Sequence, residues 1–524
     1  MNSRNHLFLA VWAVFIIGTT TFWIFKNNLP PSWDEANYLE ASEELRQSLV
    51  DHGFFNFINA TTKVLPAKAP LIAILPVPLY IIIGSSPHVA LILNLIFIAI
   101  FYIFFYKLVA EIFDTKLALA STIPISTMPL FYGLARYFYV EFGLMTLVVI
   151  WMYLVLKTKN LTDKNTLFLL GIISGLGIMM KLHFLIFVAG PAFVIFYESW
   201  KKMKRKLFDY KKVLIFIIPA LAISLPWYAR NILTVLWKAK RSTNPELLGD
   251  LYYGSPLSII NLYGSALDFI NYVVSSYWTL VLLILFVVFV HKGKKLKINY
   301  FLISWFIIPF IIFYLGPNKD YRLMLPLLPP VGILIAWFIR QIFLKKYLLL
   351  LAILSALPTL IYLNTGLFGA KFITNKISFG PLIFADKMIG GYVQAPRNES
   401  WPIVNLLKLL TTYTNVPQKT VVLASEDEAF NINGLRYYAT LNKLPLDIKS
   451  ASYFQKETSY QVIQITINQG DYLVMKIGGK PGPADLNRSN SLILQNLDQK
   501  IWQELPNNID LPDGGKIKIW QKIS

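Results

Sequence analysis

The chain has 524 residues, of which 55% are hydrophobic and only 15% charged, and its mean hydropathy is +0.52. This composition excludes a soluble globular protein of that length and indicates a polytopic membrane protein. The formal net charge of +20 does not point to nucleic acid, because the positive residues lie mostly in short loops between apolar runs, where they orient a membrane protein. Cysteine is absent, which excludes disulfides, thiolate metal sites and thiol nucleophiles.

Apolar segments suited to membrane helices follow one another through the first two thirds of the chain. They cover residues 7–25, 88–109, 117–133, 140–156, 167–197, 213–229, 273–290, 300–315, 322–339 and 347–363. We expect 7–25 to be an uncleaved first span, because no small-residue cleavage site follows it. Residues 167–197 are too long for one span and are split by Lys181-Leu182-His183, which predicts two short spans.

A further apolar stretch, 69–84, contains three prolines and ends at Gly84. As a helix it would reach only about 24 Å, so we expect a juxtamembrane or re-entrant piece there. The predicted count is then eleven transmembrane helices.

Lys and Arg gather in three short connections, at 198–212, 291–297 and 340–346, which the positive-inside rule places in the cytoplasm. With eleven spans the N-terminus lies in the cytoplasm and everything after residue 363 lies outside. The predicted domains are a transmembrane domain over 1–363 with a large extracytoplasmic loop at 26–87, a membrane-surface loop over 364–400, and an extracytoplasmic α/β domain over 401–524. Beta-rich runs beside a helix-like segment support an α/β domain, with three layers as one option.

Charged and polar side chains near the span ends collect on the predicted extracytoplasmic side. They are Asp34, Glu35, Lys68, Arg136, Glu141, Lys181, His183, Arg230, Asp320 and Arg322. Charged groups at this depth are costly unless they are paired or solvated, so a convergent set is a functional hypothesis. Carboxylates combined with an excess of fixed cations suit a substrate that bears a phosphate, with a carboxylate available to accept a proton.

The acidic residues also allow other interpretations. Asp34 and Glu35 could form a solvated turn or a helix N-cap after the first span. Together with Glu141 they could converge on a divalent cation, although no His, Asp and Glu grouping has the spacing of metal ligands. The sequence contains no P-loop, dinucleotide-binding glycine motif or nucleophile elbow.

The basic residues have structural alternatives as well. Lys68 and Arg230 could be interfacial anchors whose charged ends extend into water. Arg136 could pair with Glu141 across a short loop. His183 could be a hydrogen-bonded packing residue instead of an acid, a base or a ligand.

Six short motifs follow one another along the chain. They are Trp33-Asp34-Glu35-Ala36-Asn37-Tyr38, Lys68-Ala69-Pro70-Leu71, Ala135-Arg136-Tyr137-Phe138-Tyr139-Val140-Glu141, the glycine-rich run from Gly171 to Lys181, Leu225-Pro226-Trp227-Tyr228-Ala229-Arg230-Asn231, and Tyr321-Arg322-Leu323-Met324-Leu325-Pro326. This ordered set resembles the GT-C class of membrane glycosyltransferases, in particular the dolichyl-phosphate-mannose protein mannosyltransferases and the bacterial aminoarabinose transferases that modify lipid A. The last motif inverts the family's order of Arg and Tyr, which leaves the role of Tyr321 open.

The resemblance implies inverting transfer of a sugar from a polyprenyl-phosphate carrier to a lipid, protein or polysaccharide acceptor outside the plasma membrane. Asp34 would be the base that accepts a proton from the acceptor, with Glu35 or Glu141 orienting the acceptor or the sugar. Cations for the donor phosphate would come from Lys68, Arg136, Lys181, Arg230 and Arg322, with His183 and Tyr321 as further possible site residues.

Two other functions stay open at this point. A carrier or flippase for lipid-linked sugars could use the same cations, but the sequence shows no internal repeat of the kind that transporters carry. A structural subunit could use the polar residues only to anchor its spans, and it would show no special sensitivity at Asp34.

Overall fold

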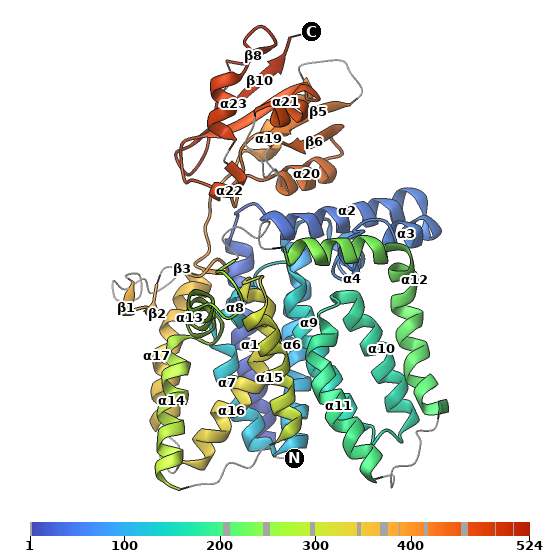
Figure 1. The fold of residues 1–524 in the computed structure, drawn as a ribbon, viewed down its shortest axis with the longest axis vertical. Helices are drawn as coiled ribbons and strands as arrows, with labels where there is room; N and C mark the ends of the chain where they lie inside the picture. The colour runs from blue at the N-terminus through green and yellow to red at the C-terminus, as the bar shows by residue number, and fades with distance from the viewer. Residues whose placement is uncertain are drawn as a thin grey trace. The chain divides into compact units, whose positions relative to one another are not determined.

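The structure of the protein is a computed structural model (Figure 1). It describes residues 3–202, 210–244, 252–293, 299–342, 347–366, 376–386, 388–412, 418–451, 460–487, 489–506 and 508–523. The chain divides into two compact units. Unit 1 holds Met1–Phe25, Thr61–Ile72 and Leu91–Pro396, and unit 2 holds Lys26–Ala60, Ala73–Ala90 and Arg397–Ser524.

Unit 1 is built mainly from apolar helices of different lengths. They are α1 (Ser3–Lys26), α6 (Pro87–Ile112), α7 (Thr115–Ser126), α8 (Pro129–Leu134), α9 (Val140–Lys157), α10 (Lys164–Met180), α11 (Phe184–Lys202), α12 (Tyr210–Ser242), α13 (Ile259–Asp268), the π-helix η3 (Phe269–Val274), α14 (Ser276–His291), α15 (Tyr300–Leu315), the 3-10 helix η4 (Tyr321–Leu327), α16 (Leu328–Gln341) and α17 (Tyr347–Thr365). Among the described residues, six helices are long and apolar enough to cross a membrane, or seven if the bent pair Ile259–Val274 and Ser276–His291 is one span.

Two breaks between helices match the sequence predictions. The segment 167–197 is interrupted between Met180 and Phe184, which confirms the predicted break at residues 181–183. The stretch 69–84 forms only α4 (Leu71–Ile74) and α5 (Val77–Ile83), which have four and seven residues and are too short to cross a bilayer. The count of eleven spans stays a prediction, and the basic stretches 203–209, 294–298 and 343–346 lie outside the described residues.

Helices α10 and α12 pack closely because α10 carries glycines at the interface. A Cβ atom on Gly171 would lie 2.3 Å from the carbonyl oxygen of Phe216, and one on Gly175 would lie 2.8 Å from that of Ala220. Small residues four positions apart let two membrane helices approach backbone to backbone. The glycine-rich motif therefore sets the position of the end of α10, where Lys181 follows.

After α17 the chain forms two small hairpins in the region where the sequence predicts a surface loop. β1 (Ile377–Phe379) pairs with β2 (Leu382–Ala385), and β3 (Met388–Ile389) pairs with β4 (Val393–Gln394), both antiparallel. The second hairpin is well buried, since Val393 is 1% and Gln394 7% exposed.

Unit 2 contains a mixed sheet covered by helices on both faces. Its described elements are α2 (Trp33–His52), α3 (Phe54–Thr61), α5, α19 (Ile403–Thr412), β5 (Lys419–Leu423), α20 (Ile432–Leu441), β6 (Leu446–Ser450), α21 (Tyr460–Asn468), β7 (Tyr472–Ile477), α22 (Ala484–Asn487), α23 (Asn490–Asn496), β8 (Trp502–Glu504), β9 (Ile509–Asp510) and β10 (Lys516–Lys522). The strand order is β6-β5-β7-β10-β8, with β9 beside β10. β5 runs parallel to β6 and β7, and β10 runs antiparallel to its neighbours.

Alternate residues of the central strands enter two separate hydrophobic cores. Val421 packs in one core with α19 and α20, whereas its neighbour Val422 packs in the other with α21 and α23. Because side chains alternate along a strand, this arrangement is a three-layer α/β/α domain. The structure adds one feature to the predicted domain: residues 26–60 and 73–90 belong to the same compact unit.

Candidate active site

Four charged side chains of unit 1 come together at one end of its helices. Lys181 Nζ lies 2.7 Å from Glu141 Oε1, and Arg322 Nε lies 3.8 Å from the same oxygen. Arg322 Nε is also 2.6 Å from Asp320 Oδ2. The group contains two carboxylates and two cations, so its formal charges balance.

Helix ends place these side chains. Glu141 lies in the first turn of α9, and Lys181 caps the C-terminal end of α10. Asp320 caps the N-terminal end of η4, where its Oδ1 accepts a hydrogen bond from the backbone N–H of Arg322 at 3.2 Å. The helix dipole favours negative charge at an N-terminus and positive charge at a C-terminus, and Glu141 and Lys181 follow that rule. Glu141 therefore pairs with Lys181, and the alternative pairing with Arg136 is not formed.

The carboxylate of Glu141 is buried, and one of its two oxygen atoms lacks a hydrogen-bond partner among the described residues. Glu141 is 1% exposed, and within the described part of the chain its Oε2 has no hydrogen-bond partner. The guanidinium carbon of Arg322 lies 4.8 Å from the centre of the Tyr139 ring. The ammonium group of Lys181 carries three N–H donors, and Glu141 accepts a hydrogen bond from one of them. The cluster thus combines cations with an open carboxylate oxygen, which can orient a polar ligand.

The second hairpin adds residues that sequence reasoning did not find. The Tyr392 hydroxyl donates to Asp320 Oδ1 at 3.2 Å, and its ring meets the Tyr139 ring edge-on at 5.8 Å. The hydroxyl oxygen of Tyr321 accepts from the backbone N–H of Gly391 at 2.6 Å. Tyr321 therefore holds the hairpin. No motif marks Tyr392 in the sequence, because its importance depends on a hairpin that returns to the helices.

The Pro-Trp-Tyr motif joins the segment around Lys68 to the end of α10. Trp227 packs with Ala69 and Met179, two residues before Lys181. The Tyr228 hydroxyl donates to the carbonyl oxygen of Ile178 at 3.0 Å. Lys68 itself is half-buried next to Ala69. This motif thus has a structural function that keeps the basic residue Lys68 near the turn that carries Lys181.

Arg136 lies in a different environment from the other predicted cations. It is 1% exposed, and its guanidinium donates to the carbonyl oxygen of Leu363 and, at 3.0 Å, to Asn364 Oδ1. The guanidinium also stacks on Trp23 with its carbon 4.9 Å from the ring centre. These contacts join α1, the turn after α8, and α17. Among the described residues, Nε and Nη2 of Arg136 have no hydrogen-bond partner, and its contact with the donor phosphate stays a prediction.

Two further predicted residues occupy less specific positions. Arg230 is exposed on α12. His183 stacks on Phe313 with ring centres 5.9 Å apart. Burial, together with the positive charge of Lys181, lowers the pKa of His183 from 6.5 to about 4, so its imidazole is neutral at neutral pH. His183 is therefore not an additional cation.

Asp34 and Glu35 belong to unit 2, at the start of α2. Glu35 is 6% exposed and its Oε2 accepts from the backbone N–H of Ser32 at 3.4 Å, as in a capping box. Ser32 is therefore the N-cap of α2, and Glu35 is the third helical residue, whose side chain completes the capping box. Asp34 is half-buried in the first turn of the same helix, where a negative charge is favourable. Among the described residues, no group of three or more His, Asp and Glu side chains could hold a metal ion.

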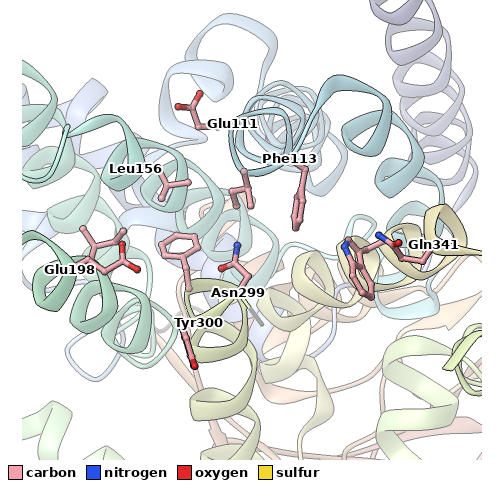
Figure 2. A pocket seen from close by; sticks show the side chains of 11 residues that line it. Glu111, Phe113, Leu156, Glu198, Asn299, Tyr300 and Gln341 are labelled. Carbon is pink, nitrogen blue, oxygen red and sulfur yellow. The ribbon is translucent and has the colours of Figure 1, made fainter. Parts of the chain in front are cut away.

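A cavity of about 830 Å³ lies in unit 1, at the ends of the helices opposite the charged cluster (Figure 2). Its lining includes Leu156 near the end of α9, Tyr300 at the start of α15 and Gln341 at the end of α16. Leu156 follows Glu141 by 15 residues on α9, which corresponds to about 22 Å along the helix. The cavity is therefore separate from the charged cluster.

Known proteins share this architecture. ArnT from Cupriavidus metallidurans bound to undecaprenyl phosphate has a TM-score of 0.59 at 12% identity, and the match covers 98% of this chain and 97% of that chain. The apo state of the same protein gives 0.57 at 11% identity, with 98% of each chain covered. The chain has the fold of the GT-C glycosyltransferases.

Further comparisons agree with the GT-C fold. The Archaeoglobus fulgidus oligosaccharyltransferase tethered to an acceptor peptide matches with a TM-score of 0.51 at 12% identity, over 90% of this chain and 69% of that chain. A family model described as dolichyl-phosphate-mannose-protein mannosyltransferase matches residues 67–229, just under a third of the chain. That range contains Glu141 and Lys181. No curated protein sequence matches the chain.

Proposed function

We propose that the protein is an inverting glycosyltransferase that moves a sugar from a polyprenyl-phosphate carrier to an acceptor at the extracytoplasmic face of the plasma membrane. The observation that carries this proposal is the buried Glu141 in contact with the half-buried Lys181 and Arg322 in a GT-C fold. One protein of that fold has been seen bound to undecaprenyl phosphate, the type of lipid that such a reaction would release. The N-terminus would be cytoplasmic and the α/β domain extracytoplasmic.

The proposed reaction breaks one bond and forms another at the anomeric carbon. The acceptor hydroxyl or amine gives its proton to the carboxylate of Asp34 and attacks the anomeric carbon from the face opposite the phosphate. The bond between this carbon and the phosphate oxygen breaks, and its electron pair stays on the leaving polyprenyl phosphate. Inversion needs no covalent intermediate on the protein.

The leaving phosphate gains one negative charge as the bond breaks. Lys181 and Arg322, with Lys68 and Arg230 as further donors, would stabilise this charge, since preorganised cations act most strongly on charge that develops in the transition state. Glu141 would hold Lys181 and Arg322 in place and orient the sugar through its open Oε2. Glu35 would support the helix turn that carries Asp34.

The test uses purified protein with radiolabelled polyprenyl-phosphate sugars and membrane acceptors. Wild type is expected to transfer label, and Asp34→Asn to reduce the rate by at least a hundredfold, within the range expected for loss of a positioned base. Asp51→Asn is the matched control, because Asp51 is an exposed carboxylate near the other end of α2.

Two outcomes would contradict the proposal. Equal activity in Asp34→Asn and wild type would show that the base lies elsewhere. If no donor is consumed while vesicles still move lipid-linked sugar across the bilayer, the protein is a carrier. Determining the anomeric configuration of the product by NMR checks the inversion.

A further inference from the structure

The turn that carries the predicted base is held by the α/β domain within unit 2. Asn433 Nδ2 donates to the backbone carbonyl oxygen of Trp33 at 2.9 Å. Asn431 Nδ2 lies 3.5 Å from the carbonyl oxygen of Pro31. The two asparagines therefore contact the backbone just before Asp34, although about 400 residues separate them along the chain.

Asn431 joins the starts of two helices. It is the N-cap of α20, and its Oδ1 accepts from the backbone N–H of Gly434 at 2.8 Å. A Cβ atom on Gly434 would lie 3.4 Å from the carbonyl oxygen of Pro31, so the two chains approach closely here. The side chain that starts α20 thus also touches the residue that precedes the cap of α2.

The remainder of α2 lies along α20, as Figure 1 shows. Leu39 and Leu45 of α2 are fully buried, as is Tyr437 of α20. Far from Asp34, Gln47 Nε2 donates to the carbonyl oxygen of Thr440 at 3.0 Å. The interface therefore stabilises the whole helix, while the two asparagines act only at its first turn.

A general base must lie within hydrogen-bond reach of the proton that it accepts, and a displacement of about 1 Å can reduce a rate roughly a hundredfold. We infer that the α/β domain positions Asp34 for catalysis, with Asn433 as the main positioning residue and Asn431 as its support. This inference rests on the proposed function. It assigns the extracytoplasmic domain a role in the reaction itself, through the backbone of the Asp34 turn.

Two variants of the full-length protein separate positioning from stability. Asn433→Ala removes the hydrogen bond to Trp33. Gln47→Ala removes an amide-to-carbonyl bond between α2 and α20, together with a bond to Glu43 Oε1, about 20 Å from Asp34 along the helix. The assay measures kcat and the KM for polyprenyl-phosphate sugar, together with the melting temperature of each variant.

We expect Asn433→Ala to lower kcat at least tenfold with the donor KM changed less than twofold. Gln47→Ala should keep kcat within twofold of wild type. Both variants should show a small decrease in Tm of similar size. Equal kcat values for the two variants would overturn the inference, since the domain would then act on stability alone. If wild type itself transfers no sugar, the proposed function fails and this inference fails with it. Active wild type with an equally active Asn433→Ala rejects only the positioning role.

Discussion

Removing the amine of Lys181 leaves the buried carboxylate of Glu141 with one cation, Arg322 Nε at 3.8 Å. Loss of one partner from a buried ion pair costs about 3 to 5 kcal/mol. Glu141 is only 2% exposed at its side chain, but Lys181 is 21% exposed and Arg322 remains nearby, so we expect the lower end, about 3 kcal/mol, for Lys181→Met. At roughly 2 °C per kcal/mol for a domain larger than 150 residues, the melting temperature should fall by about 6 °C.

The double variant Glu141→Gln/Lys181→Met tests the cause. It leaves neither charge buried, so its melting temperature should return to within about 2 °C of wild type. Transfer activity should not return, because Lys181, the lysine that we propose contacts the donor phosphate, is still missing. Lys157→Met is the control, since Lys157 forms a pair with Glu111 in which both side chains are about 40% exposed and which contributes at most about 1 kcal/mol.

Melting is followed by intrinsic tryptophan fluorescence in detergent. If the single variant Lys181→Met and the double variant melt at the same temperature, the loss does not come from an unpaired carboxylate. The electrostatic account of the cluster would then be refuted.

Three further outcomes can be checked on the same preparation. Tyr392→Phe removes the hydrogen bond to Asp320 and keeps the ring. Sugar transfer should therefore slow by roughly fivefold, which corresponds to about 1 kcal/mol, with little change in Tm. An unchanged transfer rate would show that Tyr392 is not part of the site. Gly175→Ala places a methyl group 2.8 Å from a carbonyl of α12 and should cost about 1 to 3 kcal/mol in a melting assay, whereas Gly18→Ala, with open space around it, should not. Burial and the nearby Glu44 raise the pKa of Glu40 from 4.5 to about 7, so the folded state loses stability as the pH rises from 4.5 through 7. Glu40→Gln should therefore raise the Tm at pH 8 and leave it unchanged at pH 4. An equal change in Tm at both pH values would contradict the raised pKa of Glu40.

Much of the fold follows from local patterns in the sequence. The break between α10 and α11 falls where Lys181-Leu182-His183 interrupts the apolar run, because charged and polar residues cannot continue a hydrophobic span. The proline-rich stretch after Lys68 forms only short helices, since proline removes a backbone donor. The β-rich run Thr420–Ala424 contributes to the predicted α/β domain, since it forms β5, whose residues Val421 and Val422 pack in separate cores. The other run that reads as β-rich, residues 460–467, forms the helix α21 instead, because its apolar residues Ile463 and Ile467 pack on one face of the sheet at helical spacing.

The partners of the site residues could not be predicted in the same way. The sequence predicts a phosphate contact for Arg136 as it does for Lys181, because both are basic residues near span ends. In the structure, Arg136 is buried against Trp23 and donates to oxygen atoms of α17. Tyr392 carries no motif, and its contact with Asp320 depends on a hairpin formed after α17. Such pairings join residues far apart in the chain, and sequence spacing contains no information about them.

The sequence by itself determined that this is a membrane protein with a carboxylate pair after its first helix and basic residues at later helix ends, because hydropathy, proline and charge act over a few neighbouring residues. Only the tertiary structure decided which charges pair. Glu141 meets Lys181 because α9 begins where α10 ends, and the turn of Asp34 is held by asparagines about 400 residues further along because α20 packs on α2. Packing between distant helices selects these pairs, since a buried charge or backbone carbonyl is stable only where the fold supplies its partner.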